Sequence, residues 1–268
     1  MKLIHIIGAA RPNFMKIGPL YHAFARERDW AKALIVHTGQ HYDHEMSAAF
    51  FADLGLPEPD VNLEVGSGTH AEQTAGVMLA YERFCRTSRP DWVIVVGDVN
   101  STLACGLVAK KLGMNLAHLE AGLRSRDRTM PEEINRLVTD AIADLLWTPS
   151  ADADENLLKE GIPPERIVRV GNIMIDSYEL VRGKIEGTDV AGELGLTGPY
   201  GVVTLHRPSN VDERTMLAGL LERLVEISRR ATLVFAVHPR TAARIREFGL
   251  EPVTARWQDT RSRCWGGP

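Results

Sequence analysis

Acidic side chains follow two of the apolar, β-branched runs in the sequence. Asp98 comes after Trp92–Val96, and Glu120 comes directly after Asn115–Leu119. Ligands of open α/β sheets bind beyond the carboxyl ends of the strands, so both carboxylates are expected where chemistry takes place. Asp98 has an alternative interpretation as a turn or capping aspartate. Glu120 is followed by Ala121 and Gly122 and has no evident capping role, which makes its functional interpretation the stronger one.

A further acid and a cation stand four residues apart in the next predicted helix. Glu132 and Arg136 lie on the side away from the helix's apolar stripe, and the two could pair with each other or face a ligand. Thr129 and Glu132 also have the spacing of a capping box, and from spacing alone this structural role is favoured. The stripe consists of Ile134, Leu137, Val138 and Ala141.

Basic side chains occur where strands are expected to meet helices. The loop after the first strand, Gly8-Ala9-Ala10-Arg11-Pro12-Asn13-Phe14-Met15-Lys16, lacks the GxGxxG pattern, which disfavours NAD. Arg11 and Lys16 could bind a phosphate or carboxylate at the helix N-terminus, or face water, since motifs of this size also recur by chance. His206-Arg207 and His238-Pro239-Arg240 end two successive strands, a repetition that suits a diphosphate or a developing anion.

Metal binding and cysteine chemistry are disfavoured. His37, His41 and His44 are interrupted by Gly39-Gln40, so a polar loop is favoured over zinc and no metal is expected. Cys105 lies in an apolar helical stretch and is interpreted as a packed thiol. The three cysteines are far apart and form no CxxC pair, which predicts reduced thiols and a cytoplasmic location.

Short apolar runs alternate with helical periods along the chain, which predicts an α/β fold with a doubly wound parallel sheet. Two such series are separated by a glycine-rich stretch, 183–199. We therefore expect a first Rossmann-like domain over 1–180 and a partial second domain over 181–253. The expected strands are 2–7, 34–37, 92–96, 115–119, 145–148, 167–170, 201–205 and 232–236, and helices are expected over about 212–227 and 241–248.

The last fifteen residues, 254–268, show no apolar period and are rich in Arg, Trp and Gly, as in translation of an alternate reading frame. The second series also stops after two strands, which would leave a sheet face and edge uncovered. These features predict an aberrant tail on a C-terminally truncated or frameshifted chain.

Composition excludes several classes of protein. The 268 residues are 44% hydrophobic and 25% charged, as in an ordinary globular protein rather than a disordered one. The net charge is −4 without a basic block, which disfavours nucleic-acid binding. No apolar run approaches the roughly 18 residues of a membrane span, and the run at the N-terminus is too short for a signal peptide.

Several of these motifs together resemble the non-hydrolysing UDP-N-acetylglucosamine 2-epimerases. They occur in that family's order from Lys2 to about Phe248, and the pair Glu-Ala-Gly-Leu-Arg and Pro-Glu-Glu-x-Asn-Arg is specific. The resemblance implies a GT-B architecture of two Rossmann-like domains, and a role in the biosynthesis of cell-surface polysaccharides. The motifs are residues 8–16, Thr38-Gly39-Gln40-His41, Gly97-Asp98, 118–124, 131–136, Gly171-Asn172 and 204–207.

The resemblance also implies a reaction and a set of residues. The reaction is the interconversion of UDP-GlcNAc and UDP-ManNAc through a 2-acetamidoglucal, without an organic cofactor. Mapped residue by residue, the resemblance makes Asp98, Glu120 and Glu132 the catalytic carboxylates and His206 the fourth active-site group. It makes Arg11, Lys16, Arg136 and His238 contacts to the nucleotide sugar, and Gln40 and Arg207 regulatory positions. Partners are then a UDP-sugar and a second copy in a homodimer.

The sequence departs from that family after Phe248, where no Asp-Ser-Gly-Gly-type phosphate loop and no Thr-Glu-Arg-Pro-type segment occur. Because those elements grip the uridine diphosphate, the 268-residue polypeptide is expected to be weakly active or inactive. A hydrolysing epimerase, an epimerase of a related UDP-sugar and a non-catalytic fragment stay open as alternatives. A GT-B glycosyltransferase is disfavoured by the three carboxylates.

Overall fold

The chain is described by a computed structural model that covers residues 1–9, 11–27, 29–39, 51–257 and 263–265. It divides into two compact units, Met1–Ile185 and Glu186–Pro268. Each unit is an α/β structure with a parallel sheet, which confirms the predicted fold class. None of the helices within the described residues is long and apolar enough to cross a membrane.

The first unit is built on a seven-stranded sheet in which all neighbouring strands are parallel. Its strands are β1 (Lys2–Gly8), β2 (Ala31–His37), β3 (Val61–Asn62), β4 (Trp92–Val96), β5 (Asn115–Leu119), β6 (Leu145–Thr148) and β7 (Ile167–Arg169). The order across the sheet is β3-β2-β1-β4-β5-β6-β7. The order therefore reverses between β1 and β4, and such a switch point is where doubly wound sheets bind their ligands.

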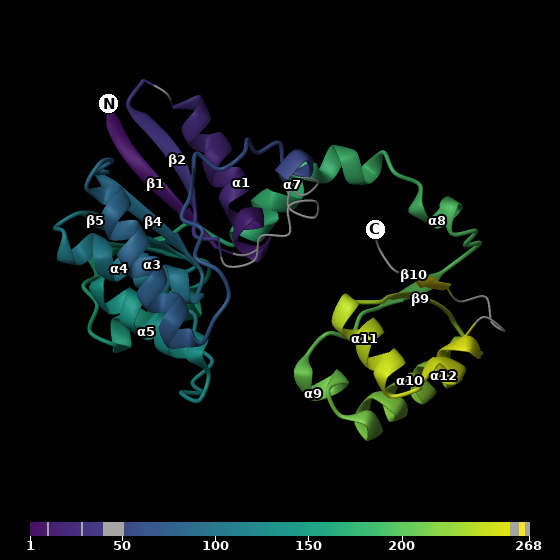
Figure 1. Ribbon diagram of the computed structural model, residues 1–268. Coiled ribbons are helices and arrows are strands. Elements are labelled where there is room, and N and C mark those ends of the chain that lie inside the picture. The colour runs from purple at the N-terminus through teal and green to yellow at the C-terminus, as the bar shows by residue number, and fades with distance from the viewer. Residues whose placement is uncertain (10, 28, 40–50, 258–262, 266–268) are drawn as a thin grey trace. The chain divides into compact units, whose positions relative to one another are not determined.

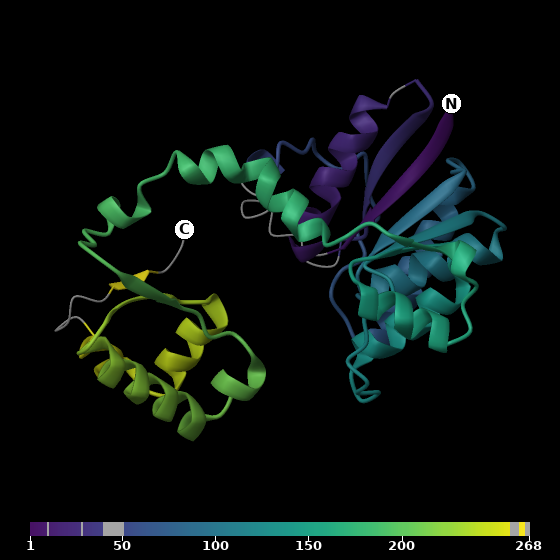
Figure 2. The same ribbon diagram turned by 180° about the vertical axis from the view of Figure 1, so that it is seen from behind.

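Helices cover both faces of this sheet (Figure 1). They are α1 (Arg11–Arg26), α3 (His70–Cys85), α4 (Asn100–Lys111), α5 (Pro131–Ile142), α6 (Ala151–Lys159), the 3₁₀ helix Pro164–Arg166 and α7 (Ile173–Glu186). Phe14 and Ile17 of α1 and Val181 of α7 join one buried cluster. Tyr81 of α3 and Cys105 of α4 join the cluster on the opposite face. Figure 2 shows the same layers from behind.

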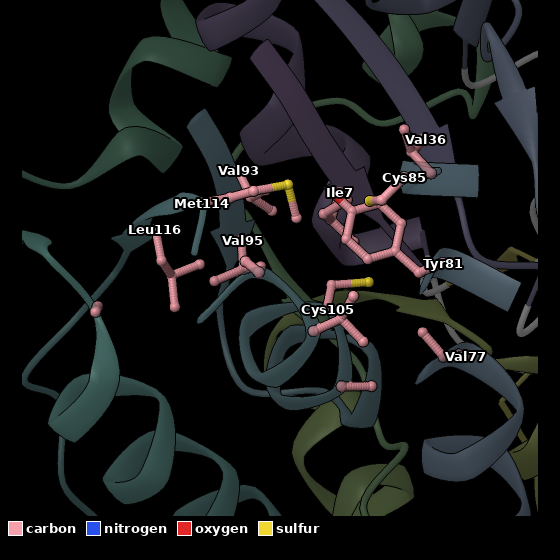
Figure 3. Close-up of a cluster of buried hydrophobic side chains, with 14 of the residues drawn as sticks. Ile7, Val36, Val77, Tyr81, Cys85, Val93, Val95, Cys105, Met114 and Leu116 are labelled. Atoms are coloured by element: carbon pink, nitrogen blue, oxygen red, sulfur yellow. The ribbon is translucent and has the colours of Figure 1, made fainter. Parts of the chain in front are cut away.

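Successive residues of the central strands enter different cores. Val93 and Val95 of β4 pack with α3 and α4, in the cluster that Figure 3 shows, whereas Ile94 and Val96 pack with α1. A strand buried on both faces needs an apolar residue at every position. This confirms the sequence-based interpretation of the continuous apolar runs. Cys105 is fully buried in the first of these clusters, and burial raises the pKa of its thiol, as expected of a packed rather than nucleophilic cysteine.

Helix α5 buries its polar side, contrary to the expectation from its apolar stripe. Glu133, Asn135, Thr139 and Asp140 are buried, whereas Ile134 is 42% exposed. The apolar spacing located the helix correctly and assigned the wrong face to the interior. The reason is that α5 lies against the carboxyl ends of β4 and β5, where backbone and charged groups need hydrogen-bond partners.

The start of α5 also differs from the expected capping box. Met130 is the N-cap residue and forms no side-chain cap, because its side chain lacks an oxygen that could accept from the first amides of the helix. The hydroxyl and amide of Thr129 instead donate to the carboxylate of Asp127, at 2.6 and 2.9 Å. The capping interpretation of Glu132 is therefore wrong, because its side chain does not cap α5.

The second unit is a three-stranded parallel sheet in the order β10-β9-β8, with helices α9 to α12 on one face (Figure 1). Its core joins Leu221 and Val225 to Phe235 and Ile245. The elements are α8 (Val190–Glu193), β8 (Tyr200–Val203), α9 (Pro208–Val211), α10 (Arg214–Ser228), β9 (Thr232–Ala236), α11 (Pro239–Glu247), α12 (Glu251–Ala255) and β10 (Arg263–Trp265).

Part of the predicted tail takes regular structure in this unit. Trp257 is 1% exposed and its ring stacks on Phe235 with centroids 5.5 Å apart. The backbone of β10 pairs with β9, so the sheet has a third strand that sequence analysis did not anticipate. One buried aromatic side chain and a three-residue strand leave no period to detect, which explains the difference.

Candidate functional site

The first acidic side chain of the site lies where the carboxyl ends of β1, β4 and β5 meet. Glu120 follows β5 directly, and its carboxylate forms an ion pair with the ammonium group of Lys16, from the first turns of α1. The two side chains are 14% and 18% exposed. Glu120 has a φ of 69°, a left-handed conformation that costs a residue other than glycine roughly 1–3 kcal/mol. Contacts with the surrounding structure therefore hold the backbone of Glu120 in a conformation that is unfavourable for an isolated residue.

Gly97 lies between the strand β4 and this ion pair. Its φ is +68°, and a Cβ built on it would lie 3.4 Å from Lys16 Nζ and 3.7 Å from Glu120 Oε2. Its amide donates to the carbonyl of Leu119 at 3.0 Å, which ties the end of β4 to the end of β5. A glycine is favoured here by the backbone conformation, since a Cβ would make only ordinary van der Waals contacts with the charged pair.

The second acidic side chain is held from α5. The carboxylate of Asp98 accepts from Arg136 Nη2 at 2.7 Å and Nε at 3.0 Å, and its backbone carbonyl accepts from Asn135 Nδ2 at 2.8 Å. The side chain of Asp98 is 33% exposed. Its carboxylate is therefore held by Arg136 and is still accessible to solvent. Asp98 therefore does not serve only as a turn or capping residue.

Glu133 fixes the guanidinium of Arg136 from the other side. Its carboxylate accepts from Arg136 Nη1 at 2.6 Å and from the amides of Ser125 and Arg126 at 3.0 and 2.9 Å. Burial acts to raise the pKa of Glu133, and the two amides and Arg136 outweigh it and lower that pKa to about 2. Sequence analysis singled out Glu132 and Arg136 and missed Glu133, although the doubled glutamate was a signal that one of them is structural.

The remaining candidates of the first unit are Glu132, Arg11 and Gln40. Glu132 lies in the first turn of α5, partly exposed, and forms no hydrogen bond or ion pair with the part of the chain that the structure describes. Arg11 opens α1, but its side chain lies outside the described residues. Gln40 lies outside them altogether. The structure therefore brings together Lys16, Asp98, Glu120 and Arg136.

The histidines of the second unit lie close to each other. The rings of His206 and His238 have centroids 5.9 Å apart and are tilted by 40°. His238 is the N-cap of α11 and its Nδ1 accepts from the amide of Arg240, while Arg207 precedes α9. Asp212 forms an ion pair with Arg240, so this arginine is not the free cation that the sequence pattern suggested.

Of the three histidines considered as metal ligands, the structure describes only His37. His37 is 1% exposed and stacks on Phe14 with centroids 5.1 Å apart, and burial lowers its pKa to about 4. His41 and His44 lie outside the described residues. Within the ranges that the structure covers, no group of three or more His, Cys, Asp or Glu side chains is arranged to hold a metal ion.

The geometry of the first unit suits proton transfer beside an anionic ligand. Two carboxylates approach the switch point of the sheet around Gly97, each paired with a cation. Paired carboxylates can accept and return a proton, and the adjacent cations can balance negative charge that develops on a ligand. Because they come from different strands, they can reach a bound ring from different directions.

Known proteins are similar to this chain in both sequence and fold. The family model described as UDP-N-acetylglucosamine 2-epimerase matches residues 24–259. The UDP-N-acetylglucosamine 2-epimerase of Methanocaldococcus jannaschii is 41% identical over 258 residues, which is 93% of this chain and 69% of that protein. The UDP-2,3-diacetamido-2,3-dideoxy-D-glucuronate 2-epimerase of Pseudomonas aeruginosa is 40% identical, over 94% of this chain and 70% of that protein.

A solved structure of a relative has a fold similar to that of this chain. The crystal structure of the M. jannaschii UDP-GlcNAc 2-epimerase in complex with UDP-GlcNAc and UDP superposes with a TM-score of 0.83 at 38% identity, over 99% of this chain and 73% of that one. This likeness confirms the GT-B-like fold class that the motifs implied. On these grounds the chain belongs to the UDP-N-acetylglucosamine 2-epimerase family.

Proposed function

We propose that this protein interconverts UDP-GlcNAc and UDP-ManNAc by inverting C2 of the sugar. The observation that carries the proposal is the pair of carboxylates, Asp98 and Glu120, anchored around Gly97 by Arg136 and Lys16 in a chain of this family. The related M. jannaschii protein is described in complex with UDP-GlcNAc and UDP, which supports a UDP-sugar as the ligand.

The chemistry explains why the site needs several acids. The hydrogen on C2 is only weakly acidic, so one carboxylate cannot remove it in an isolated step. Its loss to a carboxylate is instead coupled to cleavage of the bond between C1 and UDP, which leaves a C1–C2 double bond in a 2-acetamidoglucal. Return of UDP to C1 and of a proton to the opposite face of C2 completes the inversion. Groups on both faces of the ring are therefore required.

The proposed roles follow from these steps. Asp98, Glu120 and Glu132 exchange the protons, and His206 is the fourth active-site group. Arg11, Lys16, Arg136 and His238 contact the nucleotide sugar, while Gln40 and Arg207 contribute to regulation. Lys16 and Arg136 each hold a carboxylate, so their proposed role is double: they orient an acid and balance the charge of the departing diphosphate. No organic cofactor takes part in this route.

The test is a reaction in deuterated water, followed by proton NMR. UDP-GlcNAc incubated with the 268-residue chain should yield UDP-ManNAc that carries deuterium at C2, since the proton is lost and returned from solvent. Product without deuterium would contradict the elimination route. Stoichiometric accumulation of free UDP and ManNAc would favour the hydrolysing alternative. Absence of both reactions, with no heat on titration with UDP, would favour a non-catalytic fragment.

Two further expectations belong to the same experiment. The P. aeruginosa relative, at 40% identity, favours a diacetamido UDP-sugar as a second candidate substrate, and parallel reactions with both sugars would separate them. The expectation that this polypeptide is weakly active or inactive stays a prediction, and a rate equal to that of the full-length M. jannaschii protein would contradict it.

We also propose a homodimer in the cytoplasm, as the family resemblance implies. The exposed side of α5, with Ile134 at 42% exposure, offers an apolar surface for a second copy. Light scattering that gives the mass of one chain at micromolar concentration would contradict this assembly.

A further inference from the structure

His118 and Asp140 form a buried pair next to the backbone segments that carry the two carboxylates. His118 is the fourth residue of β5, and Asp140 lies on α5, four residues after Arg136. Their side chains are 0% and 1% exposed, and Nδ1 of His118 lies 2.6 Å from Oδ1 of Asp140. Neither residue stood out as a candidate in the sequence, although His118 lies within the motif that contains Glu120.

The hydrogen bonds of this pair fix the orientation of the His118 ring. Nε2 of His118 lies 2.7 Å from the carbonyl oxygen of Gly97, which can only accept, so Nε2 carries a proton. Nδ1 lies 2.6 Å from Oδ1 of Asp140. Burial raises the pKa of Asp140, and the charges and hydrogen bonds of His118 and Arg124 lower it by more, which keeps the carboxylate ionised. Both ring nitrogens of His118 therefore face oxygen atoms that only accept hydrogen bonds.

The pair holds the backbone beside both acids. The carbonyl of Gly97 that accepts from His118 immediately precedes Asp98. Oδ2 of Asp140 accepts from the amide of Gly122 at 3.0 Å, two residues after Glu120. Through two side chains in contact, the peptide before Asp98 is thus connected to the strained turn that carries Glu120.

A second buried histidine in the same sheet shows that packing alone does not require this arrangement. His5 of β1 is 0% exposed, and its ring nitrogens lie 3.1 Å from Tyr81 Oη and 3.3 Å from Ser88 Oγ. Hydroxyl groups can donate or accept, so they suit a neutral ring, and burial lowers the pKa of His5 to about 4. His118 differs because both of its partners only accept.

The pair is itself anchored at a distance from the site. Arg124 Nη1 lies 2.8 Å from Oδ2 of Asp140, and the same guanidinium donates to Glu160 at 2.6 and 2.8 Å. Asp140 is therefore fixed from three sides, by a histidine, an arginine and an amide. A carboxylate held in this way has a fixed orientation. Its hydrogen bond to the amide of Gly122 therefore fixes the position of that amide relative to α5.

We propose that His118 and Asp140 are positioning residues, which fix the separation and orientation of Asp98 and Glu120 for proton transfer at C2. The inference rests on the proposed function for the role of those two carboxylates. A displacement of reacting groups by about 1 Å can lower a rate on the order of 100-fold, so loss of the pair should act on kcat and leave KM nearly unchanged.

The experiment compares His118→Asn and Asp140→Asn with the matched control His5→Asn, in the full chain. The rate of deuterium entry at C2 is measured over a range of UDP-GlcNAc concentrations, with enough enzyme to detect slow variants. The dependence of this rate on substrate concentration gives kcat and KM. We expect kcat to fall on the order of 100-fold in the first two variants, with KM within about threefold, and to stay within about twofold of wild type in His5→Asn. If the single variants do not fold, the double variant His118→Asn/Asp140→Asn leaves no unpaired buried charge and should still be slow.

Ring nitrogen NMR provides a reading that needs no turnover. Nε2 of His118 should carry a proton that exchanges slowly, because it is donated to the carbonyl of Gly97. A rapidly exchanging Nε2 proton, or an unchanged kcat in a folded His118 variant, would overturn the proposal. A wild-type chain without any deuterium entry would match the inactivity expected of this polypeptide and would give no kcat for comparison. The positioning role is then decided by the amides of Gly97 and Gly122, whose hydrogen exchange should accelerate at least about tenfold in Asp140→Asn; unchanged exchange would refute it.

Discussion

Glu133 makes the stability of the first unit depend on pH in a way that can be calculated. Its pKa is lowered from 4.5 to about 2 by two amides and Arg136, against the opposing effect of burial. A carboxylate with a depressed folded-state pKa contributes stability that is fully present above its unfolded pKa and is lost as the pH falls through its folded pKa. The shift corresponds to roughly 3 kcal/mol at pH 7, and to roughly 1.5 kcal/mol at pH 3.

Urea unfolding of wild type and Glu133→Gln at pH 5 and pH 3 tests this directly, with the amide exchange of Ser125 and Arg126 as a local probe. The difference in unfolding free energy between the two proteins should shrink by about 2 kcal/mol between pH 5 and pH 3. Glu132→Gln is the matched control, and its difference from wild type should be small at both values, since Glu132 has no hydrogen-bond partner among the residues described. A Glu133→Gln difference that is equal at pH 5 and pH 3 would refute the reasoning.

The remaining predictions concern packing and the roles of the two cations. A Cβ on Gly122 would lie 2.4 Å from the carbonyl oxygen of Ala153, whereas one on Gly161 meets nothing within 4 Å at a similar φ. Gly122→Ala should therefore destabilise the chain by at least about 2 kcal/mol more than Gly161→Ala, measured by urea unfolding; equal effects would contradict this contact. Trp257→Ala should destabilise the second unit by about 3–5 kcal/mol in hydrogen exchange of β9, while Ile227→Ala, at 49% exposure, should change it by less than about 0.5 kcal/mol. Lys16→Met removes the cation beside Glu120 and should slow deuterium entry at C2 by roughly 100-fold, and a rate within about threefold of wild type would exclude that role.

The central strands and the place of the acids could be predicted because each rests on one strong local pattern. β4, β5, β6 and β9 begin and end at the expected residues, since strands buried on both faces read as unbroken apolar runs. Asp98 and Glu120 follow two such strands, and the topology rule for parallel sheets places them at one edge. The two-residue strand β3 was missed, because two residues carry no pattern.

The partners of the acids could not be predicted, because they depend on contacts between distant segments. The apolar period of α5 pointed to the wrong face, since its buried side is polar and serves the ends of β4 and β5. Glu133 and Glu132 are neighbours of one residue type, and only the amides of Ser125 and Arg126 show which one is structural. Trp257 gave no period and is nevertheless buried against Phe235.

The central claim is that Glu120, held by Lys16 at the end of β5, exchanges a proton with C2 of the sugar. The most direct measurement is the rate of deuterium entry at C2 of UDP-GlcNAc in Glu120→Gln, with the exposed Glu155→Gln as control. The account predicts a rate at least about 100-fold lower in Glu120→Gln, with UDP still bound and with Glu155→Gln unchanged. Deuterium entry at the wild-type rate in Glu120→Gln would contradict it.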